Sequence, residues 1–371
     1  MHARGGDVTA VFDLPIEKGD LVAGKYEVDR ALGSGGMGMV IRAKHVQLDE
    51  MVAIKFLRPD FAGADSVARF EREARAAAKI KGDHVARVID LGSLDNGTPY
   101  MVMEYLDGED LEQRVRKRGP LPIDEVVDFI TQACEAIAEA HALGIIHRDL
   151  KSSNLFVTRC PDGSERIKVL DFGIAKVVGP DASELSMTRT RAVMGSPMYM
   201  SPEQLNSTRN VDVRTDVWGL GVILYELLTA RPPFEGEDML ELYVKIASSP
   251  PPPLGRADAP EGLEAVILRS LEKSRDERYP NVAELASALA PFGPRRAAEA
   301  AARVLKISQG SRVFSTQTAS APSRRKKAMA AALAGAAAIA ALGALRSCGE
   351  MSHAATPSSA SPRIESVAES R

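Results

Sequence analysis

Short apolar runs separated by glycine turns open the patterned part of the chain. Residues 26–36, 37–46 and 51–57 read as successive β-rich segments, which predicts a meander of antiparallel strands. Residues 66–80 are rich in Ala, Arg and Glu at helical spacing, and further short strands are expected in the stretch 84–106. The pattern therefore predicts a small β-rich lobe, at about residues 26–107, that contains one helix.

The periodicity becomes helical after Gly108. Residues 124–144 have the spacing of an amphipathic core helix, and the second lobe, at about residues 108–292, is expected to be larger and mainly helical. The side chains expected on the buried face of this helix are Val127, Ile130, Cys134, Ile137 and Ala138. The fold class predicted is α+β, with two lobes.

Beyond residue 292 the globular pattern fades. Residues 293–327 contain a stretch rich in Ser, Thr and basic side chains and are expected to form a disordered juxtamembrane linker. The uncharged run 328–345 lies at the short end of the roughly 17 to 25 residues that cross a bilayer, so we expect a membrane helix, with a soluble Ala-rich helix as the alternative. The basic residues 324–327 before it would keep the preceding domain cytoplasmic and place the short tail 346–371 outside.

The composition limits the class of protein. A chain of 371 residues exceeds one comfortable core, so two or more folding units are expected. The net charge of -3 gives no argument for a nucleic-acid partner, and three scattered cysteines are too few for a disulfide framework or a four-ligand zinc site. Residues 1–25 are interpreted as an extension without a signal-peptide pattern, so the domain that follows should remain in the cytoplasm.

A glycine-rich segment carries the first chemical motif. Gly33, Gly35 and Gly38 have the spacing GxGxxG and are followed by Val40. Glycines allow a turn to approach phosphate oxygens closely. A dinucleotide-binding fold would place this motif between a strand and a helix, whereas another strand is expected after it, so a phosphate-covering hairpin is favoured.

A lysine on a predicted strand supplies a cation for the same phosphates. Lys55 ends the sequence VAIK, and its partner is expected to be a carboxylate on the following helix. Glu73 is our choice. Glu71 is the competitor, but at two residues' separation it should project from a different face of the helix. A solvated, purely structural charged helix remains the alternative.

The segment HRDLKSSN is the most specific motif. Asp149 can accept or orient the proton of a substrate hydroxyl, Lys151 can neutralise a moving phosphoryl group, and Asn154 can ligate magnesium. His147 is more consistent with a packed structural role. Further on, Asp171 follows an apolar strand in the sequence LDFG, where a carboxylate at the start of a loop suits a metal ligand.

This ordered set of motifs resembles the protein kinase family, specifically the bacterial eukaryotic-like (Hanks-type) serine/threonine kinases, over roughly residues 26–290. The resemblance implies the bilobal kinase fold and the use of ATP with Mg²⁺, or alternatively Mn²⁺. It implies that Asp149 is the catalytic base and that Asn154 and Asp171 hold the metal. Met103 resembles the gatekeeper. The residues that the resemblance assigns to the nucleotide and its metal are Leu32, Gly33, Ser34, Gly35, Gly36, Met37, Gly38, Val40, Ala53, Lys55, Glu73, Met103, Glu104, Leu106, Asn154 and Asp171.

Other motifs bear on the substrate and on packing. Lys151 within DLKSSN resembles the serine/threonine branch of the family, which implies protein Ser and Thr hydroxyls as acceptors. The segment GSPMYMSPE resembles the substrate-facing loop, and the resemblance implies a buried ion pair between Glu203 and Arg278. Asp216 resembles an aspartate that fixes the catalytic loop by accepting backbone hydrogen bonds.

The polar segment after Gly173 suggests regulation. The resemblance implies Thr188 and Thr190 as candidates for autophosphorylation, because they align with the usual positions in the bacterial kinases. A phosphate on this loop could pair with Arg148 and order the site. An unmodified loop is the alternative. A homodimer is a further candidate assembly. Rival functions are a pseudokinase or scaffold, which would usually lack Lys55, Asp149 or Asp171, and a small-molecule kinase, against which the GSPMYMSPE segment argues.

Overall fold

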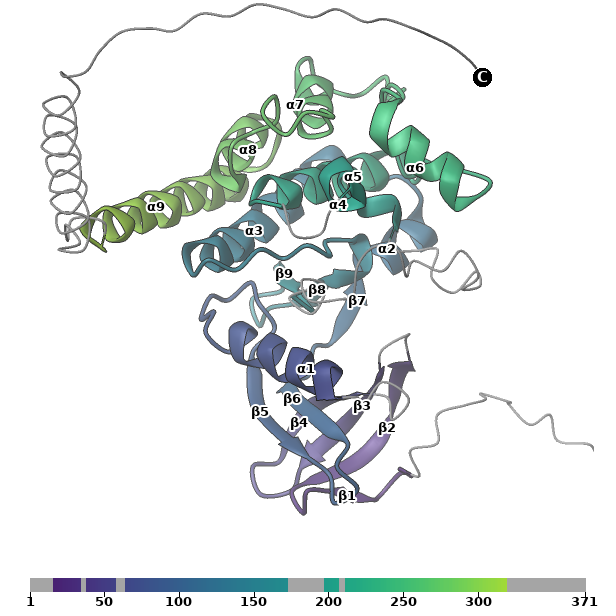
Figure 1. Cartoon of the computed structure of the whole chain (residues 1–371), viewed down its shortest axis with the longest axis vertical. Helices are drawn as coiled ribbons and strands as arrows, with labels where there is room; N and C mark the ends of the chain where they lie inside the picture. The colour runs from purple at the N-terminus through teal and green to yellow at the C-terminus, as the bar shows by residue number, and fades with distance from the viewer. Residues whose placement is uncertain (1–15, 35–37, 58–63, 173–196, 207–210, 319–371) are drawn as a thin grey trace, which may run out of the picture. The chain divides into compact units, whose positions relative to one another are not determined.

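The computed structural model describes residues 16–34, 38–57, 64–172, 197–206 and 211–318. Residues 1–312 form one compact unit and residues 313–371 a second, of which only the end of a helix is described. In the first unit a β-sheet with one helix is followed by a mainly helical region, so the predicted α+β, two-lobed organisation is confirmed (Figure 1).

The N-lobe sheet has, among the described residues, six strands in the order β1-β2-β3-β4-β6-β5, and every neighbouring pair is antiparallel. The strands are β1 Leu21–Val22, β2 Tyr26–Ser34, β3 Gly38–His45, β4 Glu50–Leu57, β5 Val88–Ser93 and β6 Pro99–Glu104. The meander from residue 26 is thus confirmed. Because β1 pairs with β2, the sheet begins before residue 26, where the domain was predicted to start. A strand of two residues is too short to produce a periodic signal in the sequence.

Helix α1 (Ala64–Ala77) packs on one side of this sheet, which is visible in Figure 1. Phe70 and Ala74 form a small core with Met101 of β6. The helix ends before the predicted residue 80, and residues 78 and 79 form a turn. This packing leaves Glu73, next to Ala74 on the helix, 3.8 Å from Lys55 of β4.

The C-lobe contains a three-stranded sheet in the order β7-β8-β9 and the helices that surround it. Its elements are β7 Gly108–Asp110, α2 Leu111–Arg118, α3 Ile123–Ala142, η2 Ser152–Asn154, β8 Leu155–Arg159, β9 Glu165–Val169, η6 Pro197–Tyr199, α4 Pro202–Asn206, α5 Arg214–Thr229, α6 Met239–Ser248, α7 Leu263–Ser270, α8 Val282–Leu289, η7 Ala290–Phe292 and α9 Arg295–Thr318. The five side chains predicted on the buried face of α3 are all buried.

Helix α5 lies at the centre of this lobe and is buried all round, as expected for a helix without a polar face. Two glycines allow close approach to it. A Cβ at Gly219 would lie 3.0 Å from the Leu150 Cβ, and a Cβ at Gly221 would lie 2.7 Å from the Ser270 Cβ. The missing side chain at Gly219 therefore lets the segment around Leu150, which carries the candidate catalytic residues, rest directly on the core.

Helix α9 shows that the disordered linker expected at residues 293–327 was wrong over Arg295–Thr318. Ala297, Ala300, Ala301 and Val304 recur at helical spacing and are buried. Alanine contributes little to a hydropathy pattern, yet its small side chain permits close packing, so the compact unit extends beyond residue 292.

None of the helices in the described ranges is both long and apolar enough to cross a membrane. The run 328–345, where a membrane helix was expected, lies outside these ranges.

Candidate active site

Three charged side chains from separate elements meet between the lobes. Lys55 lies on β4, where it is paired with Val40 of β3 and Met101 of β6. Its Nζ lies 2.7 Å from Asp171 Oδ1 and 3.8 Å from Glu73 Oε1 of α1. The carboxylate that follows β9 is thus the closer partner of Lys55.

Glu71, the competing partner, points elsewhere. It forms an ion pair at 2.7 Å with Arg75, one turn further along α1. The two glutamates differ by about 200° around the helix axis, so only one of them can face the sheet.

Burial and charge act in opposite directions on this cluster. Burial disfavours the ammonium form of Lys55, but attraction to Asp171 and Glu73 outweighs it and raises the lysine pKa above its ordinary value. Burial likewise opposes ionisation of Asp171, but Lys55 holds the pKa of this carboxyl below its usual range. Lys55 and Asp171 are therefore both charged at neutral pH.

The HRDLKSSN segment lies beside this cluster. Lys151 Nζ is 3.8 Å from Asp149 Oδ2, and the Asn154 side-chain nitrogen donates to the Asp149 carbonyl at 2.9 Å. The Leu170 N–H donates to the Asn154 carbonyl at 2.9 Å. These bonds hold Asp149 and Asn154 next to the segment that leads to Asp171.

Asp216 of α5 anchors the same segment from below. Its carboxylate is almost fully buried and accepts the backbone N–H groups of His147 and Arg148, both at 2.9 Å. The His141 Nε2 lies 2.7 Å from the same carboxylate. The predicted anchoring role is confirmed. His141 was missed by sequence reasoning, because a histidine near the end of an amphipathic helix carries no motif.

His147 is a packed structural histidine, as expected. Burial lowers its pKa, so the ring is neutral. Nε2 then donates to the Leu170 carbonyl at 3.0 Å, and Nδ1 accepts the Asp149 N–H at 3.3 Å.

Arg148 and Asp171 have φ of 64° and 47°, a left-handed conformation that is costly for residues other than glycine. Both residues belong to the candidate site, Asp171 as a partner of Lys55 and Arg148 as the neighbour of Asp149.

The expected adenine-side residues occupy β4, β6 and the segment that follows. Met103 is paired with Ala53 across the sheet. The Glu104 carboxylate accepts from Lys168 Nζ at 2.8 Å, and Lys168 lies on β9, three residues before Asp171. Sequence reasoning missed Lys168, since its pairing with Glu104 joins segments 64 residues apart.

The glycine motif is a β2–β3 hairpin, as favoured over the dinucleotide-binding alternative. Leu32, Gly33 and Ser34 are exposed at the end of β2, whereas Gly35, Gly36 and Met37 lie outside the described residues. A Cβ at Gly38 would lie 2.1 Å from the Phe56 carbonyl oxygen, so this glycine is also required for the close approach of β3 and β4.

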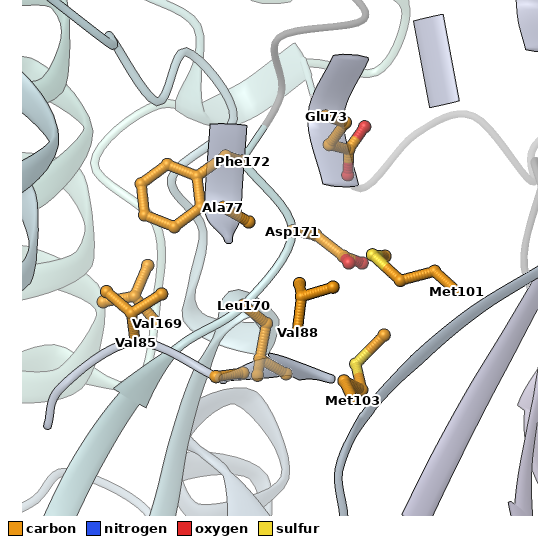
Figure 2. Close-up of a pocket in the computed structure, with 11 residues that line it drawn as sticks. Glu73, Ala77, Val85, Val88, Met101, Met103, Val169, Leu170, Asp171 and Phe172 are labelled. Atoms are coloured by element: carbon orange, nitrogen blue, oxygen red, sulfur yellow. The ribbon is translucent and has the colours of Figure 1, made fainter. Parts of the chain in front are cut away.

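A small cavity lies beside the charged cluster and is lined in part by Met103. Figure 2 shows Glu73 and Asp171 on its border together with Met101 and Phe172. Except for the two carboxylates its walls are apolar. These apolar walls border the Glu73 and Asp171 side of the charged cluster.

An ion pair beneath the substrate-facing segment matches the expectation. Arg278, whose side chain is fully buried, donates to Glu203 of α4 at 2.7 and 2.8 Å. On the next residue of α4, the Gln204 side chain donates to the Arg148 carbonyl at 2.8 Å. Helix α4 thus connects this ion pair to the HRDLKSSN segment.

The chemistry of two residues suits magnesium. Asn154 offers an amide oxygen and Asp171 a carboxylate, which are hard oxygen ligands. Mg²⁺ commonly takes only one or two protein carboxylates, with waters and phosphates completing its shell. The described residues contain no group of three or more His, Cys, Asp or Glu side chains able to hold a metal, so a metal bound only by such residues is not indicated there.

Comparisons with known proteins agree on one family. The family model described as protein kinase domain matches residues 26–264. The chain is 39% identical to the serine/threonine-protein kinase pkn3 of Myxococcus xanthus, covering 70% of this chain and 48% of that protein. It is also 39% identical to PknB of Mycobacterium leprae, a serine/threonine-protein kinase, covering 70% of this chain and 42% of the relative. The chain thus spans less than half the length of these curated relatives.

A solved structure is similar over nearly its whole length. The crystal structure of the Mycobacterium tuberculosis PknI kinase domain aligns with a TM-score of 0.57 at 30% identity, covering 74% of this chain and 98% of that one.

Proposed function

This chain belongs to the protein kinase family, and on that premise we propose that it is a serine/threonine protein kinase that transfers the γ-phosphoryl group of ATP to protein hydroxyls. The meeting of Lys55, Glu73 and Asp171, at 2.7 and 3.8 Å, carries the proposal. Phosphoryl transfer depends on positioning and electrostatic stabilisation, which fixed charges of this kind can supply.

The nucleotide would lie between the glycine hairpin and the C-lobe. Lys55 would contact its phosphates, held in place by Glu73. The backbone of Glu104 and Leu106 would bind the adenine edge, with Met103 behind it. The side chains and backbone that would enclose the remaining nucleotide are Leu32, Gly33, Ser34, Gly35, Gly36, Met37, Gly38, Val40 and Ala53.

The metal and the acceptor hydroxyl would lie on the C-lobe side. Asn154 and Asp171 would hold Mg²⁺, or alternatively Mn²⁺, which when bound neutralises charge on the phosphates. Asp149 would orient the acceptor hydroxyl and receive its proton. Lys151, 3.8 Å from Asp149, would offset negative charge on the transferred group.

Incorporation of labelled phosphate tests this proposal. Asp149→Asn and Lys55→Met should each lower the rate at least about 100-fold, since each removes a group that acts in the transition state. Lys44→Met is the matched control, because Lys44 is an exposed lysine of the same sheet that pairs with Asp49. Equal incorporation by the wild type and both site variants would refute the mechanism, and no incorporation by the wild type would favour a scaffold.

We further propose autophosphorylation at Thr188 and Thr190, which lie outside the described residues. Supporting it, Nη1 of Arg148 is buried and, within the described part of the chain, has no hydrogen-bond partner. A phosphate could complete that site. Mass spectrometry that finds no phosphate in active enzyme, with the double alanine variant fully active, would remove this idea.

We also propose a membrane anchor and an assembly for the chain. Residues 328–345 would anchor the chain in a membrane with the kinase domain in the cytoplasm, and a homodimer is a candidate assembly. Membrane fractionation tests the anchor: a wholly soluble protein, unchanged by deletion of residues 328–345, would contradict it. Protein substrates with Ser or Thr acceptors follow from the proposed activity.

A further inference from the structure

Helix α9 places two arginines against two buried or nearly buried carboxylates of α3. Arg296 Nε lies 2.6 Å from Asp128 Oδ1, and Arg303 Nε lies 2.9 Å from both oxygens of Glu135. Arg296 and Arg303 are seven residues apart on α9, and Asp128 and Glu135 are seven residues apart on α3. Seven residues make about two helical turns, so the two ion pairs lie in register. Ala297 and Ala301 of α9 belong to the same buried core as the apolar side chains of α3.

The first ion pair continues toward β9 through buried side chains. Asp128 Oδ2 accepts from Gln132 Nε2 at 2.7 Å, and Gln132 Oε1 accepts the backbone N–H of Ile167 at 2.9 Å. Asp128 is 1% exposed. Burial raises the pKa of Asp128, and Arg296 opposes that shift, so the arginine favours the ionised acid.

The second ion pair reaches the same residue of β9. Glu135 Oε2 lies 3.8 Å from Nε2 of His84, and His84 Nδ1 lies 2.9 Å from the Ile167 carbonyl oxygen. Burial lowers the pKa of His84 and the Glu135 carboxylate opposes that shift, so the charge of Glu135 acts on the ring that donates from Nδ1 to the Ile167 carbonyl. The N–H of Ile167 is thus bonded to Gln132 and its carbonyl to His84. The acids next to these two side chains, Asp128 and Glu135, are paired with arginines of α9.

Ile167 holds the outer edge of a short strand. β9 is the edge strand of its sheet and is paired with β8 on the other side. Asp171 lies four residues beyond Ile167, and the intervening Val169 bonds its N–H to the His84 carbonyl at 2.8 Å. The arginines are about half exposed, a setting in which ion pairs contribute little to stability, but their partners are not exposed.

We propose that Arg296 and Arg303 are positioning residues for the Asp171 site, acting through Asp128 and Gln132 and through Glu135 and His84 on the backbone of Ile167. The inference rests on the role proposed for Asp171. It makes α9, which lies beyond the segment matched by the kinase family model, part of the catalytic machinery's support.

The test compares full-length Arg296→Gln/Arg303→Gln with wild type. Hydrogen exchange at the Ile167 amide, without nucleotide, should accelerate about tenfold, and kcat should fall about three- to tenfold, as expected for coupling through a packed network. The Mg²⁺ concentration for half-maximal rate should rise, whereas KM for the protein substrate should not. Arg295→Gln is the control, because Arg295 is 93% exposed and pairs with Glu299 within α9.

A second pair of variants covers misfolding of the double variant. Arg303→Glu should show the same changes in smaller degree, and adding Glu135→Arg should restore them in part by reversing the pair. Unchanged amide exchange and Mg²⁺ dependence in all folded variants would overturn the proposal, as would equal changes in Arg295→Gln. Amide exchange at Ile167 can be measured in an inactive protein, so it tests the arginines independently of the proposed function. A fully active Asp171→Asn variant would refute the role proposed for Asp171 but not the coupling of α9 to Ile167.

Discussion

Glu203→Gln should destabilise the C-lobe strongly, because it leaves a buried cation without its counter-ion. The Arg278 side chain is fully buried and Glu203 is 14% exposed at its side chain. Two charge-assisted hydrogen bonds at 2.7 and 2.8 Å join them. A glutamine can accept one of these bonds but turns an NH₂ group toward the guanidinium.

The magnitude follows from what remains around the cation. Breaking a buried pair by removing one partner costs about 3 to 5 kcal/mol. Arg278 also donates to the carbonyls of Glu272, Lys273 and Arg214 and stacks on Trp218, so part of its charge stays compensated. We therefore expect the lower end of that range, about 3 kcal/mol.

The assay uses the single tryptophan of the chain. Trp218 lies 4.9 Å from the Arg278 guanidinium, so its fluorescence in a urea titration reports unfolding of this region. Asp276→Asn is the control: it breaks the 2.6 Å pair with Arg214, but Asp276 is 77% exposed and the cost should stay below about 1 kcal/mol. Equal losses in the two variants would refute the argument that burial sets the cost.

Three further predictions follow from single contacts. Gly38→Ala should cost about 1 to 3 kcal/mol, since its Cβ would lie 2.1 Å from the Phe56 carbonyl oxygen, whereas Gly33→Ala, with nothing within 4 Å, should be near neutral; thermal melts compare them. Asp216→Asn should lose about 3 kcal/mol in urea unfolding and lower kcat, because an amide cannot accept from both backbone N–H groups and His141; a wild-type kcat would contradict the anchoring role. Burial, and then the Arg278 cation, lowers the pKa of Lys273 from 10.5 to about 8. Between pH 8 and pH 10.5 the unfolded chain therefore binds more protons than the folded chain, so the free energy of unfolding should rise with pH in the wild type. It should rise less in Lys273→Met, as urea titrations at several pH values would measure.

The order of motifs along the chain was enough to predict the fold class and the residues that meet at the site. Lys55 in VAIK, Asp149 in HRDLKSSN and Asp171 in LDFG could be assigned to one site because these motifs, in this order, resemble those of the protein kinase family. Helical spacing also separated Glu73 from Glu71.

Tertiary structure alone decided which groups pair across long distances. The closer partner of Lys55 proved to be Asp171, 116 residues away, and the pairing of Lys168 with Glu104 leaves no local pattern. Helix α9 was missed for a related reason. Its alanines and arginines give no clear apolar pattern in the sequence, and only the folded chain provides the carboxylates of α3 that pair with the arginines. Periodicity records what each segment can bury, but the partner that buries it is fixed only when the chain has folded.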